Sequence, residues 1–118
     1  MKTGKPKVVC LCGSTKFYKA FQKAYLNETL AGNIVLSLGV FRHSQKEAHG
    51  TNLTLTEDDL KQLEELNKRR IDMADEILII NVEGYIGEAT TRELIYAKLH
   101  NKPIRWLEPR GGYNEDCD

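Results

Sequence analysis

The sequence lacks a long hydrophobic run and an excess of charge of either sign. None of its segments approaches the roughly 20 consecutive apolar residues that cross a bilayer. Residues 1–7 are basic, but the apolar run after them is far shorter than the core of a signal peptide. Seventeen basic residues balance seventeen acidic ones, so no overall field attracts the chain to nucleic acid or to an anionic membrane. We therefore expect a cytoplasmic protein whose partner is neither a nucleic acid nor a membrane.

Cysteine is also scarce, and its three positions follow no metal-ligand spacing. An odd number of cysteines argues against a disulfide framework, and the spacing argues against a zinc site. Cys10 and Cys12 alternate within one apolar run, so their side chains should share one face of a strand as small buried filler. The sequence therefore predicts a protein without a bound metal or cofactor.

Apolar runs alternate with amphipathic segments along the chain. Continuous apolar runs are typical of strands buried in a parallel sheet, and we expect such strands at 7–12, 34–38, 76–81 and 103–107. Helical spacing of apolar residues predicts helices between them, from the turn at 13–15 to 32–33, from Thr56 to Asp75, and from 88 to 100. The long polar segment from 39 to 55 is typical of a binding loop or lid, or of a partly disordered loop.

This order of elements predicts an α/β fold. We expect a small flavodoxin-like or Rossmann-like three-layer sandwich, with about four parallel strands in the order 2-1-3-4 and helices on both faces. Residues 1–109 should form the single domain, and 110–118 a flexible acidic tail. In such a sheet, ligands bind at the carboxyl ends of the strands where the strand order reverses. That place lies between the turn after the first strand and the segment 81–87.

The turn Gly13-Ser14-Thr15 stands where the first strand gives way to a helix. Backbone N–H groups and two hydroxyls at such a turn favour an anion or a sugar hydroxyl. The full G-x-G-x-x-G and P-loop patterns are absent. The alternative interpretation is structural: the glycine permits the turn, and the serine caps the helix.

Two polar side chains are candidates for the expected crevice. Glu93 has Ala89 and Ala97 one helical turn away on either side, so it lies on a stripe of small residues that a ligand or the sheet can approach. The alternative for Glu93 is a solvated glutamate. Asn67 interrupts the apolar stripe of the preceding helix, so it must find partners or border a cavity. Glu88 is interpreted as a first-turn acid that complements the helix dipole.

Several short motifs are spread along the chain: Cys12-Gly13-Ser14, Ala74-Asp75, Gly87, Glu93-Leu94, Tyr96-Ala97 and Lys102-Pro103. Together they resemble the nucleoside 2-deoxyribosyltransferase superfamily, which includes the 2-deoxynucleoside 5-phosphate N-hydrolases. The resemblance covers nearly the whole chain and is closest to short members of unassigned activity, through Gly84-Tyr85-Ile86-Gly87-Glu88. It implies that Glu93, at the glutamate of the E-L-x-x-A motif, attacks the anomeric carbon of a deoxyriboside. It also implies a homodimer or a larger homo-oligomer in which a neighbouring subunit completes the site.

The chain departs from this family pattern at two places. Asn67 stands where active members have an aspartate, eight residues before Asp75, and an amide orients groups but is no general base. Cys10 stands near the place of a tyrosine in the first strand. The proton transfer then comes from His43 or Asp72, or the glycosidic chemistry is weak, altered or absent.

The resulting hypothesis is an N-glycosidic bond hydrolase, or a glycosyl (deoxyribosyl) transferase, that acts on a nucleoside, a nucleotide or a related ligand. Its catalytic residues are Glu93, as nucleophile, and Asn67. Arg92 lies about 100° from Glu93 around the helix and is expected to face water or a subunit interface. The alternative hypothesis, which Asn67 favours, is a non-catalytic nucleotide-binding or sensing module that uses the same crevice. The expected substrate-binding residues are Cys12, Gly13, Ser14, Thr15, Arg42, His43, Asn81, Tyr85 and Gly87, and either Tyr85 or Trp106 stacks on the base.

Overall fold

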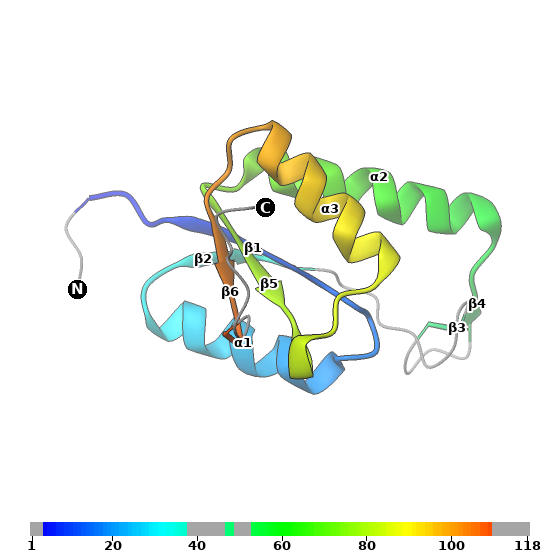
Figure 1. Cartoon of the computed structure of the whole chain (residues 1–118), viewed down its shortest axis with the longest axis horizontal. Helices are drawn as coiled ribbons and strands as arrows, with labels where there is room; N and C mark the ends of the chain where they lie inside the picture. Colours follow the sequence, from blue (N-terminus) through cyan, green and yellow to red (C-terminus); the bar gives the residue numbers. More distant parts are fainter. Residues whose placement is uncertain (1–3, 38–46, 49–52, 110–118) are drawn as a thin grey trace.

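The structure is a computed structural model, and it describes residues 4–37, 47–48 and 53–109. Its centre is a sheet of four parallel strands in the order β2-β1-β5-β6 (Figure 1). These strands are β1 (Val8–Gly13), β2 (Ile34–Leu36), β5 (Glu76–Ile80) and β6 (Ile104–Trp106). They correspond, in sequence order, to the strands expected from the apolar runs. The predicted α/β fold and the predicted strand order are therefore confirmed.

Three α-helices cover this sheet in the described part of the chain: α1 (Tyr18–Leu30), α2 (Glu57–Met73) and α3 (Glu88–Leu99). Figure 1 shows α2 and α3 together on one face of the sheet and α1 on the other. Because successive side chains of a strand point to opposite faces, β1 supplies Cys10 and Cys12 to the core under α2 and α3, and Val9 and Leu11 to the core under α1. Both cysteines are buried, as the C-x-C spacing predicts.

A local signal in the sequence marks the start of α2 but not that of α1. Thr56 accepts a hydrogen bond from the backbone N–H of Asp59 at 3.0 Å, and the Asp59 side chain accepts one from the N–H of Thr56 at 2.9 Å. The predicted cap of α2 is therefore confirmed, in the form of a capping box. The alternative interpretation of the turn, in which Ser14 caps α1, is wrong. That helix begins at Tyr18 with Phe17 as its N-cap residue, so Ser14 is too far from the first turn to cap it.

Two features were not expected from the sequence. An antiparallel pair, β3 (Glu47–Ala48) with β4 (Leu53–Thr54), lies between β2 and α2 in the chain. A 3-10 helix, η1 (Val82–Gly84), follows β5 and holds Glu83 at a φ of 54°. Arg42, His43 and the expected tail 110–118 lie outside the described residues. Across the described ranges, no helix is long and apolar enough to cross a membrane.

Candidate active site

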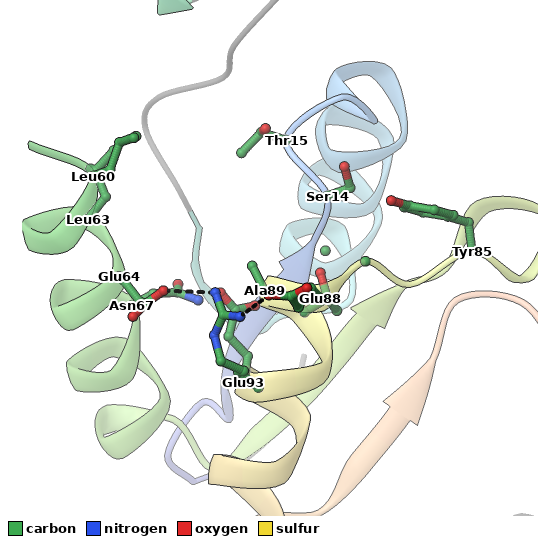
Figure 2. A pocket seen from close by; sticks show the side chains of 14 residues that line it. Ser14, Thr15, Leu60, Leu63, Glu64, Asn67, Tyr85, Glu88, Ala89 and Glu93 are labelled. Carbon is green, nitrogen blue, oxygen red and sulfur yellow. Dashed lines mark hydrogen bonds and ion pairs between the residues drawn. The ribbon is translucent and has the colours of Figure 1, made fainter. Parts of the chain in front are cut away.

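A pocket of about 520 Å³ lies at the carboxyl ends of β1 and β5, beside α2 and the start of α3 (Figure 2). A parallel sheet of this strand order places its ligands there. The walls are residues 13–15 at the end of β1, Tyr85, six residues between 87 and 93, and the α2 side chains Leu60, Leu63, Glu64 and Asn67. A pocket of this size is in the range of small-molecule sites.

Gly13 lets β1 and β5 lie close together where the pocket begins. A Cβ atom at Gly13 would lie 2.9 Å from both the Cβ atom and the carbonyl oxygen of Ile80, so only glycine fits beside β5. The chain then turns at Ser14, whose carbonyl accepts a hydrogen bond from the N–H of Phe17 at 3.1 Å. The turn leaves Ser14 and Thr15 along the pocket wall instead of on the first turn of α1.

The neighbours of Glu93 on α3 hold its carboxylate at the edge of the core. Leu94 and Ala97 are buried, whereas Ala89 is exposed and lines the pocket. Glu93 itself is half-buried. Burial is the main reason that the pKa of Glu93 rises from the ordinary value of 4.5 to about 7, and the carboxylate of Glu64 acts in the same direction. At neutral pH, Glu93 therefore exists in both protonation states.

Three neighbours oppose this rise in the pKa of Glu93. Asn67 and Cys12 favour the ionised carboxylate through hydrogen bonding, and Arg92 favours it through its positive charge. The pKa of the Cys12 thiol is raised, first by its contact with Cys10, then by burial and by Glu93. Cys12 is 1% exposed and does not line the pocket. The expected contact of Cys12 with a ligand is therefore corrected, because its thiol contacts the carboxylate of Glu93 from within the core.

Asn67 faces the pocket from α2 (Figure 2) and is 2% exposed. The Oδ1 atom of Asn67 and the Oε1 atom of Glu93 are both buried, and neither has a hydrogen-bond partner among the described residues. A buried acceptor without a donor costs about 1–3 kcal/mol. Asn67 thus borders a cavity, which is one of the two outcomes expected for it. Both oxygens are buried behind the pocket wall and are left without a donor by the described residues.

Tyr85 forms the opposite wall from Asn67 (Figure 2). Its ring meets the ring of Phe17 edge to face, with the centroids 5.8 Å apart and an angle of 82° between the planes. The Nζ atom of Lys16 lies 3.9 Å from the centroid of the Tyr85 ring. The ammonium group of Lys16 therefore covers one face of the Tyr85 ring. A Cβ atom at Gly87 would lie 3.1 Å from the Tyr85 hydroxyl, so a larger residue there would press against that hydroxyl.

Arg92 lies at the rim of the pocket with its side chain 51% exposed, so it faces water, one of the two expected surroundings, and also borders the site. Its guanidinium donates to Glu64 of α2 at 3.1 Å and to Glu88 of its own helix at 3.0 Å. The Glu88 side chain is 91% exposed, so these ion pairs contribute little stability. Their effect is to link α2 to α3 across the pocket and to place two carboxylates around the guanidinium of Arg92.

Apart from Asn67, the α2 wall is the part of the site that sequence reasoning missed. Leu60, Leu63, Glu64 and Asn67 succeed one another at helical spacing, so they share one side of α2. The sequence does contain a signal for this wall. Asn67 is a polar side chain in an apolar stripe, and such a residue marks the side of a helix that borders a cavity.

Asn81 does not belong to the pocket. It is 2% exposed, its Nδ2 atom donates to the carbonyl oxygen of Glu108 at 3.0 Å, and its Oδ1 atom accepts from the N–H of Glu108 at 2.8 Å. Both ends of the amide are therefore occupied. The expected role of Asn81 in substrate binding is corrected to a structural one, in which it ties the chain after β6 to the end of β5.

Asp72 and Trp106 also lie away from the pocket. Asp72 accepts a hydrogen bond from the Tyr96 hydroxyl at 2.7 Å and pairs with Arg69 at 3.4 Å, so it is not placed to move a proton at Glu93. Trp106 packs against the core under α2 and α3 and does not stack in the pocket. In the part of the chain that the structure describes, no group of three His, Cys, Asp or Glu residues could hold a metal ion.

Comparison of the chain with protein-family models, with curated proteins and with solved structures found no match. The function is therefore argued from the pocket itself and from the motifs that resemble the nucleoside 2-deoxyribosyltransferase superfamily.

Proposed function

We propose that the protein hydrolyses or transfers the N-glycosidic bond of a nucleoside, a nucleotide or a related ligand, with Glu93 as nucleophile. The observation that carries this proposal is the half-buried carboxylate of Glu93, which lines a pocket of about 520 Å³ and has an unpaired oxygen. A carboxylate in this setting suits a reaction that passes through an oxocarbenium-like state, because it can stabilise the positive charge or form a glycosyl ester. The match of Glu93 to the E-L-x-x-A motif supports the same role.

The reaction has two steps. In the first, an oxygen of Glu93 forms a bond to C1′ of the sugar while the C1′–N bond breaks, and the electron pair of that bond leaves with the base. The base nitrogen takes up a proton from water. In hydrolysis, a water molecule then attacks C1′, displaces the carboxylate and loses a proton to solvent. In transfer, a second base takes the place of that water molecule.

The protonation state of Glu93 sets the pH dependence of the first step. Only the ionised carboxylate is a nucleophile, and the pKa of Glu93 is about 7. The rate of base release in the free enzyme should therefore rise as the pH increases through about 7 and level off above it. The amide of Asn67 does not ionise at these pH values and cannot act as a general acid or base, so its role is to orient the carboxylate and the sugar.

The test is base release from a panel of nucleosides, deoxynucleotides and NAD-type dinucleotides, followed by chromatography. Glu93→Gln should lower the rate by roughly a thousandfold or more, since it removes the attacking group. Glu65→Gln is the matched control, because Glu65 lies on α2 outside the pocket with its side chain 61% exposed. Equal rates in the Glu93→Gln variant and the wild-type protein would refute the proposal.

A second candidate function is a nucleotide-binding or sensing module without turnover. The observation that favours it is Asn67, which occupies the place of a carboxylate and cannot act as a general base. Binding of a nucleotide without release of its base, with the same dissociation constant in the wild-type protein and in Glu93→Gln, would support this module over the enzyme. Sedimentation velocity would test the expectation of a homodimer or a larger assembly in either case.

A further inference from the structure

The turn after β5 holds one residue in an unfavourable backbone conformation. In η1, Glu83 has a φ of 54° and a ψ of 31°, which is the left-handed region that costs free energy for a residue with a side chain. The N–H of Gly84 donates to the carbonyl oxygen of Asn81 at 2.9 Å, and the N–H of Tyr85 donates to that of Val82 at 3.0 Å. These two hydrogen bonds close the turn but do not involve Glu83. Contacts from outside the turn are therefore needed to hold Glu83 in this conformation.

Glu108, which follows β6, supplies such contacts. Its Oε1 atom accepts a hydrogen bond from the N–H of Glu83 at 3.0 Å. Its own N–H donates to Oδ1 of Asn81 at 2.8 Å, and its carbonyl oxygen accepts from Nδ2 of Asn81 at 3.0 Å. Asn81 is 2% exposed, so these two bonds are shielded from water. Glu108 thus holds both the residue at which the turn begins and the residue with the unfavourable φ.

The turn leads directly into Tyr85, which forms the pocket wall opposite Asn67 (Figure 2). Tyr85 is 45% exposed, so the position of its ring depends on the backbone of the turn. A shift of the turn would change the distance between this ring and the α2 side of the pocket. Glu93 on α3 is held separately, because Leu94 and Ala97 beside it are buried in the core. The turn therefore controls one wall of the pocket and not the carboxylate.

We propose that Glu108 is a positioning residue of the pocket, which holds the turn so that Tyr85 stands where the ligand binds. The inference rests on the proposed function, since the ligand beside Tyr85 is the nucleoside or nucleotide that loses its base. Glu108 does not line the pocket itself and acts through the N–H of Glu83 and the amide of Asn81. Its loss should accordingly weaken ligand binding more than it slows the chemical step at Glu93.

The first test is the kinetics of base release from the nucleoside or nucleotide that the wild-type protein cleaves fastest. Glu108→Ala removes the acceptor for the N–H of Glu83, so it should raise KM about tenfold and change kcat less than about twofold. Partial unfolding would instead lower the apparent kcat and leave KM unchanged. The pH midpoint of kcat/KM should stay at about 7, because the surroundings of Glu93 are not altered.

Two variants separate the hydrogen bond from other effects of the substitution. Glu108→Gln keeps an oxygen acceptor at the same place and should give a KM within about twofold of the wild-type value. Glu65→Ala is the control for the removal of a glutamate, since the Glu65 side chain on α2 is 61% exposed and lies outside the pocket. It should leave both KM and kcat unchanged.

Glu83→Gly tests the role of the backbone conformation. Glycine adopts positive φ values about as readily as negative ones, so a turn with glycine at this position needs less support from the carboxylate of Glu108. In the Glu83→Gly background, Glu108→Ala should therefore raise KM by less than about threefold. A tenfold rise in both backgrounds would show that the carboxylate does not act through the conformation of Glu83.

Amide hydrogen exchange tests the contact without a ligand. The amide of Glu83 should exchange at least about tenfold faster in Glu108→Ala than in the wild-type protein, because its hydrogen-bond acceptor is lost. Exchange in Glu108→Gln should resemble that of the wild type. The amide of Ile79 in β5, a buried residue, should exchange at the same rate in all three proteins. Unchanged exchange at Glu83 in Glu108→Ala would overturn the inference.

The outcomes distinguish this inference from the proposed function. If no ligand releases its base, but nucleotides bind about tenfold more weakly to Glu108→Ala than to Glu108→Gln and the wild-type protein, the proposed function fails and the inference stands. If base is released with the same KM in Glu108→Ala and the wild type, the function stands and the inference fails. Absence of binding by every nucleoside and nucleotide would overturn both.

Discussion

Replacement of Glu93 by glutamine should make the protein more stable at alkaline pH and leave its stability at acidic pH nearly unchanged. Burial raises the pKa of Glu93 from 4.5 to about 7 in the folded protein. Between these two values, the folded state binds more protons than the unfolded state, so the free energy of unfolding falls as the pH rises. Above pH 7 the carboxylate of Glu93 is ionised in a partly buried site, and the free energy of unfolding falls no further.

The size of the effect follows from the difference between the two pKa values. One pKa unit corresponds to about 1.4 kcal/mol, so the change from 4.5 to about 7 corresponds to a loss of up to about 3 kcal/mol at pH 8. Glutamine has the shape of the protonated carboxyl group and carries no charge at any pH. The Glu93→Gln variant should therefore match the wild-type protein near pH 4.5 and exceed its stability by up to about 3 kcal/mol at pH 8.

The assay is urea unfolding of both proteins at a series of pH values from 4.5 to 8, with the difference in unfolding free energy plotted against pH. Other titrating groups contribute equally to both proteins and cancel in that difference. Glu65→Gln is the control, since the exposed Glu65 side chain on α2 should give no such trend. A difference between Glu93→Gln and the wild type that does not change with pH would refute the argument that burial raises the pKa of Glu93.

Three further predictions concern the fold around the site. Gly13→Ala should destabilise the protein by about 1–3 kcal/mol in urea unfolding, because the new Cβ atom would lie 2.9 Å from Ile80, and little or no loss would contradict the close approach of β1 to β5. Thr56→Ala removes the cap of α2 and should cost about 1 kcal/mol in the same assay, whereas Thr56→Ser should cost much less. Arg105 lowers the pKa of Glu28, so this pair stabilises the protein above pH 4.5 and loses that effect as the pH falls through the lowered pKa. In the Glu28→Gln variant, the free energy of unfolding should therefore fall less as the pH is lowered below 4.5. The same fall as in the wild-type protein would show that the pair has no such role.

Much of the architecture follows from local patterns. The apolar run that includes Cys10 and Cys12 has the length and continuity of a buried parallel strand, and the structure places it at the centre of the sheet. Thr56 and the acids after it mark the start of α2, because the cap and the helix dipole act within one turn. Such signals are visible in the sequence because the interacting groups lie a few residues apart.

The errors arose where the partner of a side chain is distant in the sequence. Asn81 was assigned to the ligand because it follows β5, but its amide is occupied by the backbone of Glu108, which follows another strand. Arg92 was assigned to water or a subunit interface from its angle on α3; its side chain is 51% exposed, and its contact with Glu64 on α2 was not expected. The position of a residue on a helix gives the direction in which its side chain leaves the backbone. It does not tell which groups the end of a long side chain contacts.

The sequence by itself therefore predicted the α/β fold with its strand order, the shared face of Cys10 and Cys12 on β1, and Glu93 as the carboxylate to examine. The periods of strands and helices give the elements and the residues that share a face, and right-handed parallel connections reduce the strand orders to a few. The tertiary structure alone decided that Asn67 and Glu93 line one pocket with their oxygens unpaired, that the pKa of Glu93 is about 7, and that Cys12 lies in the core behind it. Burial and hydrogen bonding depend on all the elements that surround a side chain, and those elements come from distant parts of the chain.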